Sequence, residues 1–250
     1  MAAMDEFRAE REAVKNGSFK EKLSYFWTYY KWYAIIPFLI IVCIISFIHE
    51  RVTATDTVLN GILLNINPID SDPSDLTNGF YEEQDIDRKL YDINLNTSLS
   101  YHPESTNNTS AYATIQALMA WNAAGELDFI CGDQSAMTDL AYKGYCTDLS
   151  KILTEEQFAG YEPYFLYIDQ AVVDQRNEAY EKNIELSSIP IPDPDKPETM
   201  KKPVPVLLNL PPGEALVQAY GDITDTIIFG ICSNATNKEM AMNFIKNPTK

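Results

Sequence analysis

The chain has 250 residues and a formal net charge of −17 at pH 7, with 36 acidic and 19 basic residues. An acidic surface repels nucleic acid, so we expect no nucleic-acid partner. Residues 52–250 are enough for one domain with a real core, but too few for two full-sized lobes and a hinge.

The first apolar run predicts a transmembrane helix. Residues 32–48, WYAIIPFLIIVCIISFI, contain no charged residue. At about 1.5 Å per residue this helix would be about 25 Å long, which is the short end of what spans a bilayer core. Aromatic residues crowd its N-terminal edge, where amphipathic rings favour the membrane interface. We therefore expect a single-pass protein of the cell membrane.

Basic residues on either side of this run predict its orientation. Only Arg51 closely follows the run, whereas six basic residues precede it: Arg8, Arg11, Lys15, Lys20, Lys22 and Lys31. Cytoplasmic flanks carry the excess of Lys and Arg, so residues 1–31 should be cytoplasmic and residues 52–250 extracellular. Helical spacing of Phe19, Leu23 and Phe26 indicates an interfacial helix within residues 1–31, although a plain extension of the span fits equally well.

Two other interpretations of the apolar run stay open. A cleaved signal peptide would fit the small residue Ala54 after Val52, but the segment before the run is long for that class. A buried core helix is the second alternative, and the aromatic belt argues against it.

Beyond the span, apolar patterns of two periods alternate along the chain. Strands are predicted at residues 57–65, 92–101, 126–133 and 225–234, and helices at 111–124, 135–143, 154–161 and 237–245, with a weaker helical face in 71–91. A Pro-rich segment near 189–205 cannot form a regular helix. The alternation predicts an α/β domain with a mainly parallel sheet and helices on both faces.

Cysteine usage is uninformative about pairing. Three of the four cysteines lie beyond the span, Cys131, Cys146 and Cys232, and no Cys-x-x-Cys motif occurs. An odd number leaves at least one unpaired or paired between chains. Cys131 and Cys232 lie in apolar runs and behave by default as small buried hydrophobes, and one disulfide among the three remains open.

Three ordered segments resemble a known family. They are AAGELDFICGD at 123–133, LAYKGYCTDLSKIL at 140–153, and TIIFGICSNATNKEMAMNFI at 226–245. Together they resemble the sugar-type extracellular solute-binding proteins of ABC importers, mainly their first lobe. The resemblance implies a periplasmic-binding fold, a bacterial source and non-catalytic binding of a small solute such as a sugar or peptide. The second lobe would have to fit into residues 150–225, which are few and Pro-rich.

Four polar residues are predicted to contact such a solute. In open α/β sheets, ligands bind outside the carboxyl ends of the strands. Asn65 and Asn67 lie at and just after the end of the first predicted strand, and Asp133 and Gln134 lie at and just after the end of the third. Their side chains can hydrogen-bond sugar hydroxyls or peptide groups. For Asp133 there is also a structural role, as the cap of the helix that follows.

No pattern in the sequence predicts catalysis. The two histidines, His49 and His102, are far apart, and Gly-x-Ser-x-Gly and phosphate-loop motifs do not occur. The acidic residues between 70 and 87 lack the spacing of a calcium loop. We expect no enzyme, cofactor or metal. The expected function is a membrane-anchored, extracellular solute-binding-like domain, and the alternative is a cleft-less protein-interaction module of the cell envelope.

Overall fold

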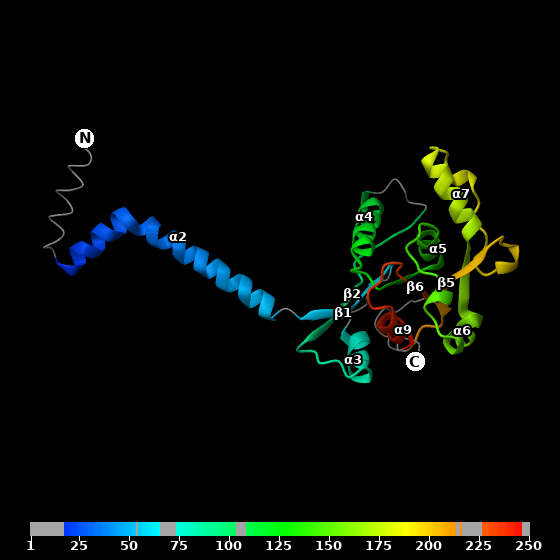
Figure 1. The fold of residues 1–250 in the computed structure, drawn as a ribbon, viewed down its shortest axis with the longest axis horizontal. Coiled ribbons are helices and arrows are strands. Elements are labelled where there is room, and N and C mark those ends of the chain that lie inside the picture. Colours follow the sequence, from blue (N-terminus) through cyan, green and yellow to red (C-terminus); the bar gives the residue numbers. More distant parts are fainter. Residues whose placement is uncertain are drawn as a thin grey trace. The chain divides into compact units, whose positions relative to one another are not determined.

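The computed structural model describes residues 18–53, 55–65, 74–103, 109–213, 216 and 227–246. It divides into two compact units, residues 1–54 and 55–250. The first described helix, α2, covers Phe19–Thr53 as one continuous helix with Pro37 inside it. Within it, Lys31–His49 is long and apolar enough to cross a membrane. The predicted span and the described part of the predicted interfacial segment therefore belong to one helix (Figure 1).

The second unit contains one six-stranded sheet. Its strands are β1 (Asp56–Leu63), β2 (Tyr91–Asn96), β3 (Phe129–Gly132), β4 (Phe165–Asp169), β5 (Pro203–Leu210) and β6 (Ile227–Ile231). They are ordered β2-β1-β3-β6-β5-β4. Strand β1 pairs in parallel with β2 and β3, whereas β3–β6, β6–β5 and β5–β4 are antiparallel. The α/β class is confirmed, but the expectation of a mainly parallel sheet is wrong because the sheet is mixed.

The predicted strand at 225–234 is β6, which pairs antiparallel with β3. Strands β4 and β5, which complete the antiparallel part of the sheet, were not predicted because they lie in stretches rich in Tyr and Pro. Proline lacks the N–H that a sheet ladder needs and is uncommon inside strands, yet β5 contains Pro203 and Pro205. The structure accommodates Pro205 at an irregularity of register, between Leu166 and Tyr167 of β4. Strand β4 is at the edge of the sheet. Its Tyr167 N–H donates to the Pro194 carbonyl (3.0 Å), so the Pro-rich loop covers part of this edge.

Helices lie on both faces of this sheet. They are α3 (Ser74–Glu83), α4 (Thr109–Ala124), α5 (Gln134–Tyr142), α6 (Glu155–Tyr161), α7 (Gln170–Glu181) and α9 (Lys238–Lys246). Figure 1 shows α4 and α5 on one side of the sheet and α3 and α9 on the other. The predicted helices at 111–124, 135–143, 154–161 and 237–245 are confirmed within two residues at each end. Helix α7 was not predicted.

Aromatic packing fixes one face of the sheet. Phe129 of β3 stacks on Phe244 of α9 with ring centroids 5.2 Å apart, and Phe80 of α3 meets Phe244 edge-on at 5.1 Å. On the opposite face, Met137 of α5 packs closely over Gly230 of β6. The buried side chains of both faces belong to one continuous core. The described part of residues 55–250 is thus a single layered module.

Candidate functional site

The predicted binding residues that the structure describes meet at the carboxyl ends of β1 and β3. The Asn65 amide donates to Asp133 Oδ2 (2.5 Å) and to the Tyr101 carbonyl (2.7 Å), and Asn65 Oδ1 accepts from the Tyr101 N–H (2.7 Å). Asn65 has a positive φ of 59°, which asparagine tolerates better than most residues. Asn67 lies outside the described residues. The predicted rim therefore exists as a local network that ties three chain segments together.

Asp133 and Gln134 also have partners inside the protein. Asp133 is the N-cap of α5, and its side chain accepts from the Ala136 N–H at 2.9 Å. The capping role expected as an alternative is thus confirmed. The Gln134 amide donates to Asp195 Oδ2 at 3.2 Å. Since both residues are exposed, a ligand would have to compete with these contacts or add to them.

A second polar cluster next to the rim was not predicted. Tyr101, which is buried, donates its hydroxyl to Asp139 of α5. Lys143 donates to Asp139 Oδ2 and to the Tyr101 hydroxyl, both at 2.6 Å. Burial, followed by the hydrogen bond to Asp139, raises the pKa of Tyr101 far above its usual range. The phenol therefore stays protonated at neutral pH and acts as a hydrogen-bond donor, not as a base.

The sequence could have predicted only the Asp139–Lys143 pair of this cluster. Asp139 and Lys143 are four residues apart on a predicted helix, a spacing that favours an ion pair. Tyr101 follows a different strand, so its contribution depends on how the sheet brings β2 and α5 together.

A hollow of about 400 Å³ lies at the other end of β1 and β3, away from their carboxyl ends. It is lined by Thr57, Asn60, Gly125, Glu126, Asp128, Thr236 and Asn237. Asp128 is 3% exposed and accepts from the backbone N–H groups of Asn60 and Asn237, each at 2.9 Å. Both carboxylate oxygens are thereby used to join β1, β3 and the start of α9. Asp128 is therefore a structural residue at a strand–loop junction.

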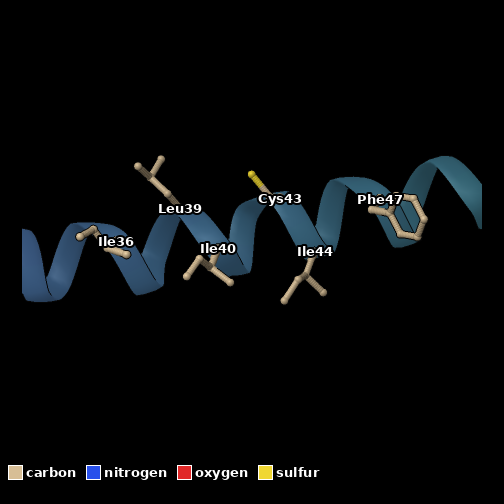
Figure 2. Close-up of a pocket in the computed structure, with 6 residues that line it drawn as sticks. All are labelled: Ile36, Leu39, Ile40, Cys43, Ile44 and Phe47. Atoms are coloured by element: carbon tan, nitrogen blue, oxygen red, sulfur yellow. The ribbon is translucent and has the colours of Figure 1, made fainter.

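A larger hollow, of about 530 Å³, lies on α2. Figure 2 shows that its lining comes from a single helix: Ile36, Leu39, Ile40, Cys43, Ile44 and Phe47. No polar group is among these residues apart from the Cys43 thiol. Such a surface suits lipid chains or another apolar helix, and it lacks the convergent polar groups of a small-molecule site.

Helix α4 has an exposed face that is unusual for a helix on a protein surface. Its sequence, TSAYATIQALMAWNAA, contains no charged residue. Tyr112 and Met119 are 66% and 61% exposed, and Ala113, Gln116, Ala120 and Ala123 are exposed around them. A surface helix normally has a charged or polar outer face. We call these six residues the outer face of α4.

Neither the described side chains nor known proteins indicate a particular chemistry for this site. Across the described ranges, no group of three or more His, Cys, Asp and Glu residues is placed to hold a metal ion. No protein family, curated protein or solved structure matches this chain. The resemblance to solute-binding proteins therefore stays a prediction.

Proposed function

We propose that this chain is a single-pass membrane protein whose second unit is a non-catalytic interaction module outside the cell. In this proposal the outer face of α4 binds a protein partner. The observation that carries it is that α4 has no charged residue and yet exposes Tyr112 and Met119. Exposed apolar surface of this kind typically marks a contact with another molecule.

The membrane topology in this proposal rests on α2 and its flanks. Lys31–His49 has the length and hydropathy of a span. Basic residues are concentrated before it, and the acidic excess belongs to the residues after it. This distribution supports a cytoplasmic N-terminus, with residues 55–250 on the other side of the membrane.

Two features favour a protein-interaction module over a solute-binding domain. The described strands of the second unit form one sheet, and its buried side chains form one core. The solute-binding proteins that the sequence resembles bind their ligands between two lobes. The rim residues Asn65, Asp133 and Gln134 already bond to protein groups. Neither feature requires a bound solute.

The negative net charge of the chain limits the kinds of protein that could bind to α4. Two copies of a chain with a net charge of −17 repel each other, which disfavours self-association. A partner with an apolar groove and a basic rim would complement both the uncharged α4 face and the negative net charge of the chain. We therefore assign the outer face of α4 to a different protein with a basic surface, anchored in or bound to the same membrane.

A photocrosslinking experiment tests this assignment. A photoreactive residue replaces Tyr112 in the full chain, which is then irradiated in native membranes. We expect one heteromeric adduct, which weakens as salt screens the basic rim and disappears in the Met119→Glu variant. As matched controls, the same photoreactive residue replaces Tyr180, exposed on α7, and a separate Tyr180→Glu variant carries the probe at position 112.

The controls determine the meaning of each result. The Tyr180→Glu variant should retain the adduct from position 112, and the probe at position 180 should not give it. An adduct of two identical chains would replace the proposed partner with a second copy. Absence of any adduct from position 112, or an adduct that survives Met119→Glu, would contradict docking on α4.

A small-solute site is the second candidate, favoured by the convergence of Asn65, Asp133 and Gln134 at the carboxyl ends of the strands. The melting temperature of the full chain in detergent would be measured with sugars, amino acids and short peptides. A ligand at about 100 times its Kd adds about 2.7 kcal/mol, which raises the midpoint by roughly 5–10 °C. Gln134→Ala should remove that rise while leaving the ligand-free midpoint nearly unchanged. No rise across the panel would eliminate this candidate.

A further inference from the structure

Two cysteines face each other across an isolated antiparallel bridge. Cys146 follows α5, Cys232 directly follows β6, and the two residues are bridge partners. The hydrogen bonds that close the bridge come from their neighbours: Thr147 N–H to the Ile231 carbonyl and Ser233 N–H to the Tyr145 carbonyl, both 2.8 Å. Cys146 and Cys232 are therefore a non-hydrogen-bonded pair, the arrangement in which opposite side chains are closest.

This arrangement fits the geometry of a disulfide. The Cα atoms of a non-hydrogen-bonded pair are about 4.5 Å apart, within the range of about 4.4–6.8 Å that disulfides span. Side chains of directly opposed residues project to the same face of the sheet. Cys146 Sγ lies 2.6 Å from where a Cβ on Gly230 would be. Gly230 precedes Cys232 by two residues on the same face, so its missing side chain makes room for the sulfur.

The sheet register excludes the other buried cysteine. Cys131 pairs with Phe229 across β3 and β6, whereas the neighbouring pair is Ile130 with Gly230. Successive residues of a strand point to opposite faces. Cys131 thus lies on the face of Phe229, opposite to that of Gly230 and Cys232. Cys43, the fourth cysteine, lies in the apolar segment of α2.

We propose that Cys146 and Cys232 form an intramolecular disulfide in the mature protein. The two thiols give up two protons and two electrons as the S–S bond forms, and the disulfide of an oxidant outside the cell is reduced to two thiols. A thiol–disulfide oxidoreductase or an oxidised small thiol would serve as that oxidant. The proposal takes from the proposed function only the location of the second unit, because disulfides persist in oxidising compartments.

Burial indicates when the bond forms. Cys232 is fully buried and Cys146 is 9% exposed. Burial raises the pKa of Cys146 to about 12, and burial, followed by the charges of Cys146 and Asp128, raises that of Cys232. Since the thiolate is the attacking species, the folded dithiol exchanges slowly. Oxidation should therefore occur during folding, and burial should then shield the bond from reductants.

Thiol counting on the full chain tests the pair. Cells are quenched in acid, and the chain is denatured and alkylated with a polyethylene glycol maleimide, before or after reduction. We expect two reactive thiols before reduction and all four afterwards. Cys146→Ser and Cys232→Ser should each leave three reactive thiols without reductant. Cys131→Ser should leave one before reduction and three after it. Four reactive thiols in the unreduced native chain would overturn the proposal.

Refolding in vitro tests the Cys146–Cys232 pairing independently of where the second unit is located in the cell. The denatured full chain is refolded in detergent with oxidised glutathione, and the linked peptides are mapped by mass spectrometry. A Cys146–Cys232 link in vitro, with four free thiols in cells, would keep the geometry and contradict the extracellular location. Failure in both settings would overturn the pairing itself. Reduction of the linked chain should lower its melting temperature by roughly 10 °C, because the bond closes a loop of about 85 residues.

Discussion

The Phe129 ring lies directly against the backbone of Gly61, so that a Cβ at residue 61 would be 2.2 Å from the ring Cζ. These residues are paired across the parallel strands β1 and β3. The same ring also stacks on Phe244 of α9, which restricts its movement. The absence of a side chain at Gly61 thus allows α9 to pack onto the sheet.

Gly61→Ala should destabilise the second unit. A methyl group inserted here overpacks a rigid core, which typically costs about 1–3 kcal/mol. The free energy of unfolding of the full chain in detergent, measured by urea titration, would detect this loss. Gly160→Ala is the matched control: nothing lies within 4 Å of its added Cβ. Because Gly160 is inside α6, alanine there should stabilise by about 0.5–1 kcal/mol. Equal effects of the two variants would contradict the packing argument.

Asp169 joins three segments through its buried carboxylate. It accepts from the backbone N–H groups of Lys201 (2.8 Å), Lys202 (3.0 Å) and Ala171 (3.0 Å). Burial alone would raise the pKa of Asp169, but these hydrogen bonds outweigh burial and hold it below its usual range. The stability they contribute is present above the unfolded-state pKa of about 3.9 and is lost as the pH falls through the lower folded-state pKa.

Asp169→Asn should therefore be pH-sensitive in comparison with the natural chain. At pH 7 we expect the variant to lose about 2 kcal/mol of unfolding free energy, because a buried N–H loses its acceptor. This difference should shrink as the pH falls below about 4, because the carboxylate of the unfolded chain is then protonated while the folded chain takes up its proton only at lower pH. Denaturant titrations at pH 7 and pH 3 provide the measurement. Asp174→Asn, at an exposed position of the following helix, should change stability by less than about 0.5 kcal/mol at pH 7.

Asn65 contributes both a backbone conformation and a side-chain network. Asn65→Gly keeps the positive φ accessible and loses only the hydrogen bonds to Tyr101 and Asp133, at a cost of roughly 1–2 kcal/mol. Asn65→Ala loses the same bonds and also strains the backbone by about 1–2 kcal/mol. We therefore expect the alanine variant to melt at a lower temperature than the glycine variant. Equal melting temperatures would show that the conformation of residue 65 carries no strain.

The sequence predicted the elements that carry a single periodicity or a clear helix signal. The predicted strand at residues 225–234 and the predicted helix at 237–245 correspond to β6 and α9. What it could not predict was pairing between distant segments. Strand β5 contains Pro203 and Pro205, and it is held by neighbours on both sides of the sheet. That tertiary context overrides the low strand propensity of proline.

The candidate site shows the same division. Asp133 and Asn65 were found because each follows a predicted strand, and such positions meet at one edge of a sheet. Tyr101 was missed because, as the last residue of a predicted strand, it carries no local signal for its contact with Asp139. The pairing of Cys146 with Cys232 depends on the bridge register, which no pattern in the sequence specifies.

Thr138 and Thr154 should respond in opposite directions to the same substitution. The Thr138 hydroxyl of α5 is buried without a hydrogen-bond partner in the structure. Thr154 is the N-cap of α6, where its hydroxyl accepts from the Gln157 N–H in a capping box. Thr138→Val removes an unsatisfied polar group and keeps the shape, so stability should rise by about 0.5–1 kcal/mol. Thr154→Val removes a cap and should cost about 1 kcal/mol.

Melting curves of the two variants in one detergent buffer measure this contrast directly. For a unit of this size the midpoints should move by roughly 2–4 °C, upward for Thr138→Val and downward for Thr154→Val. The chemical change is the same at both sites, because a hydroxyl is replaced by a methyl group. A fall in the midpoint for Thr138→Val would mean that its hydroxyl is hydrogen-bonded to water or to another group in solution, because only a satisfied hydroxyl contributes stability that valine would remove.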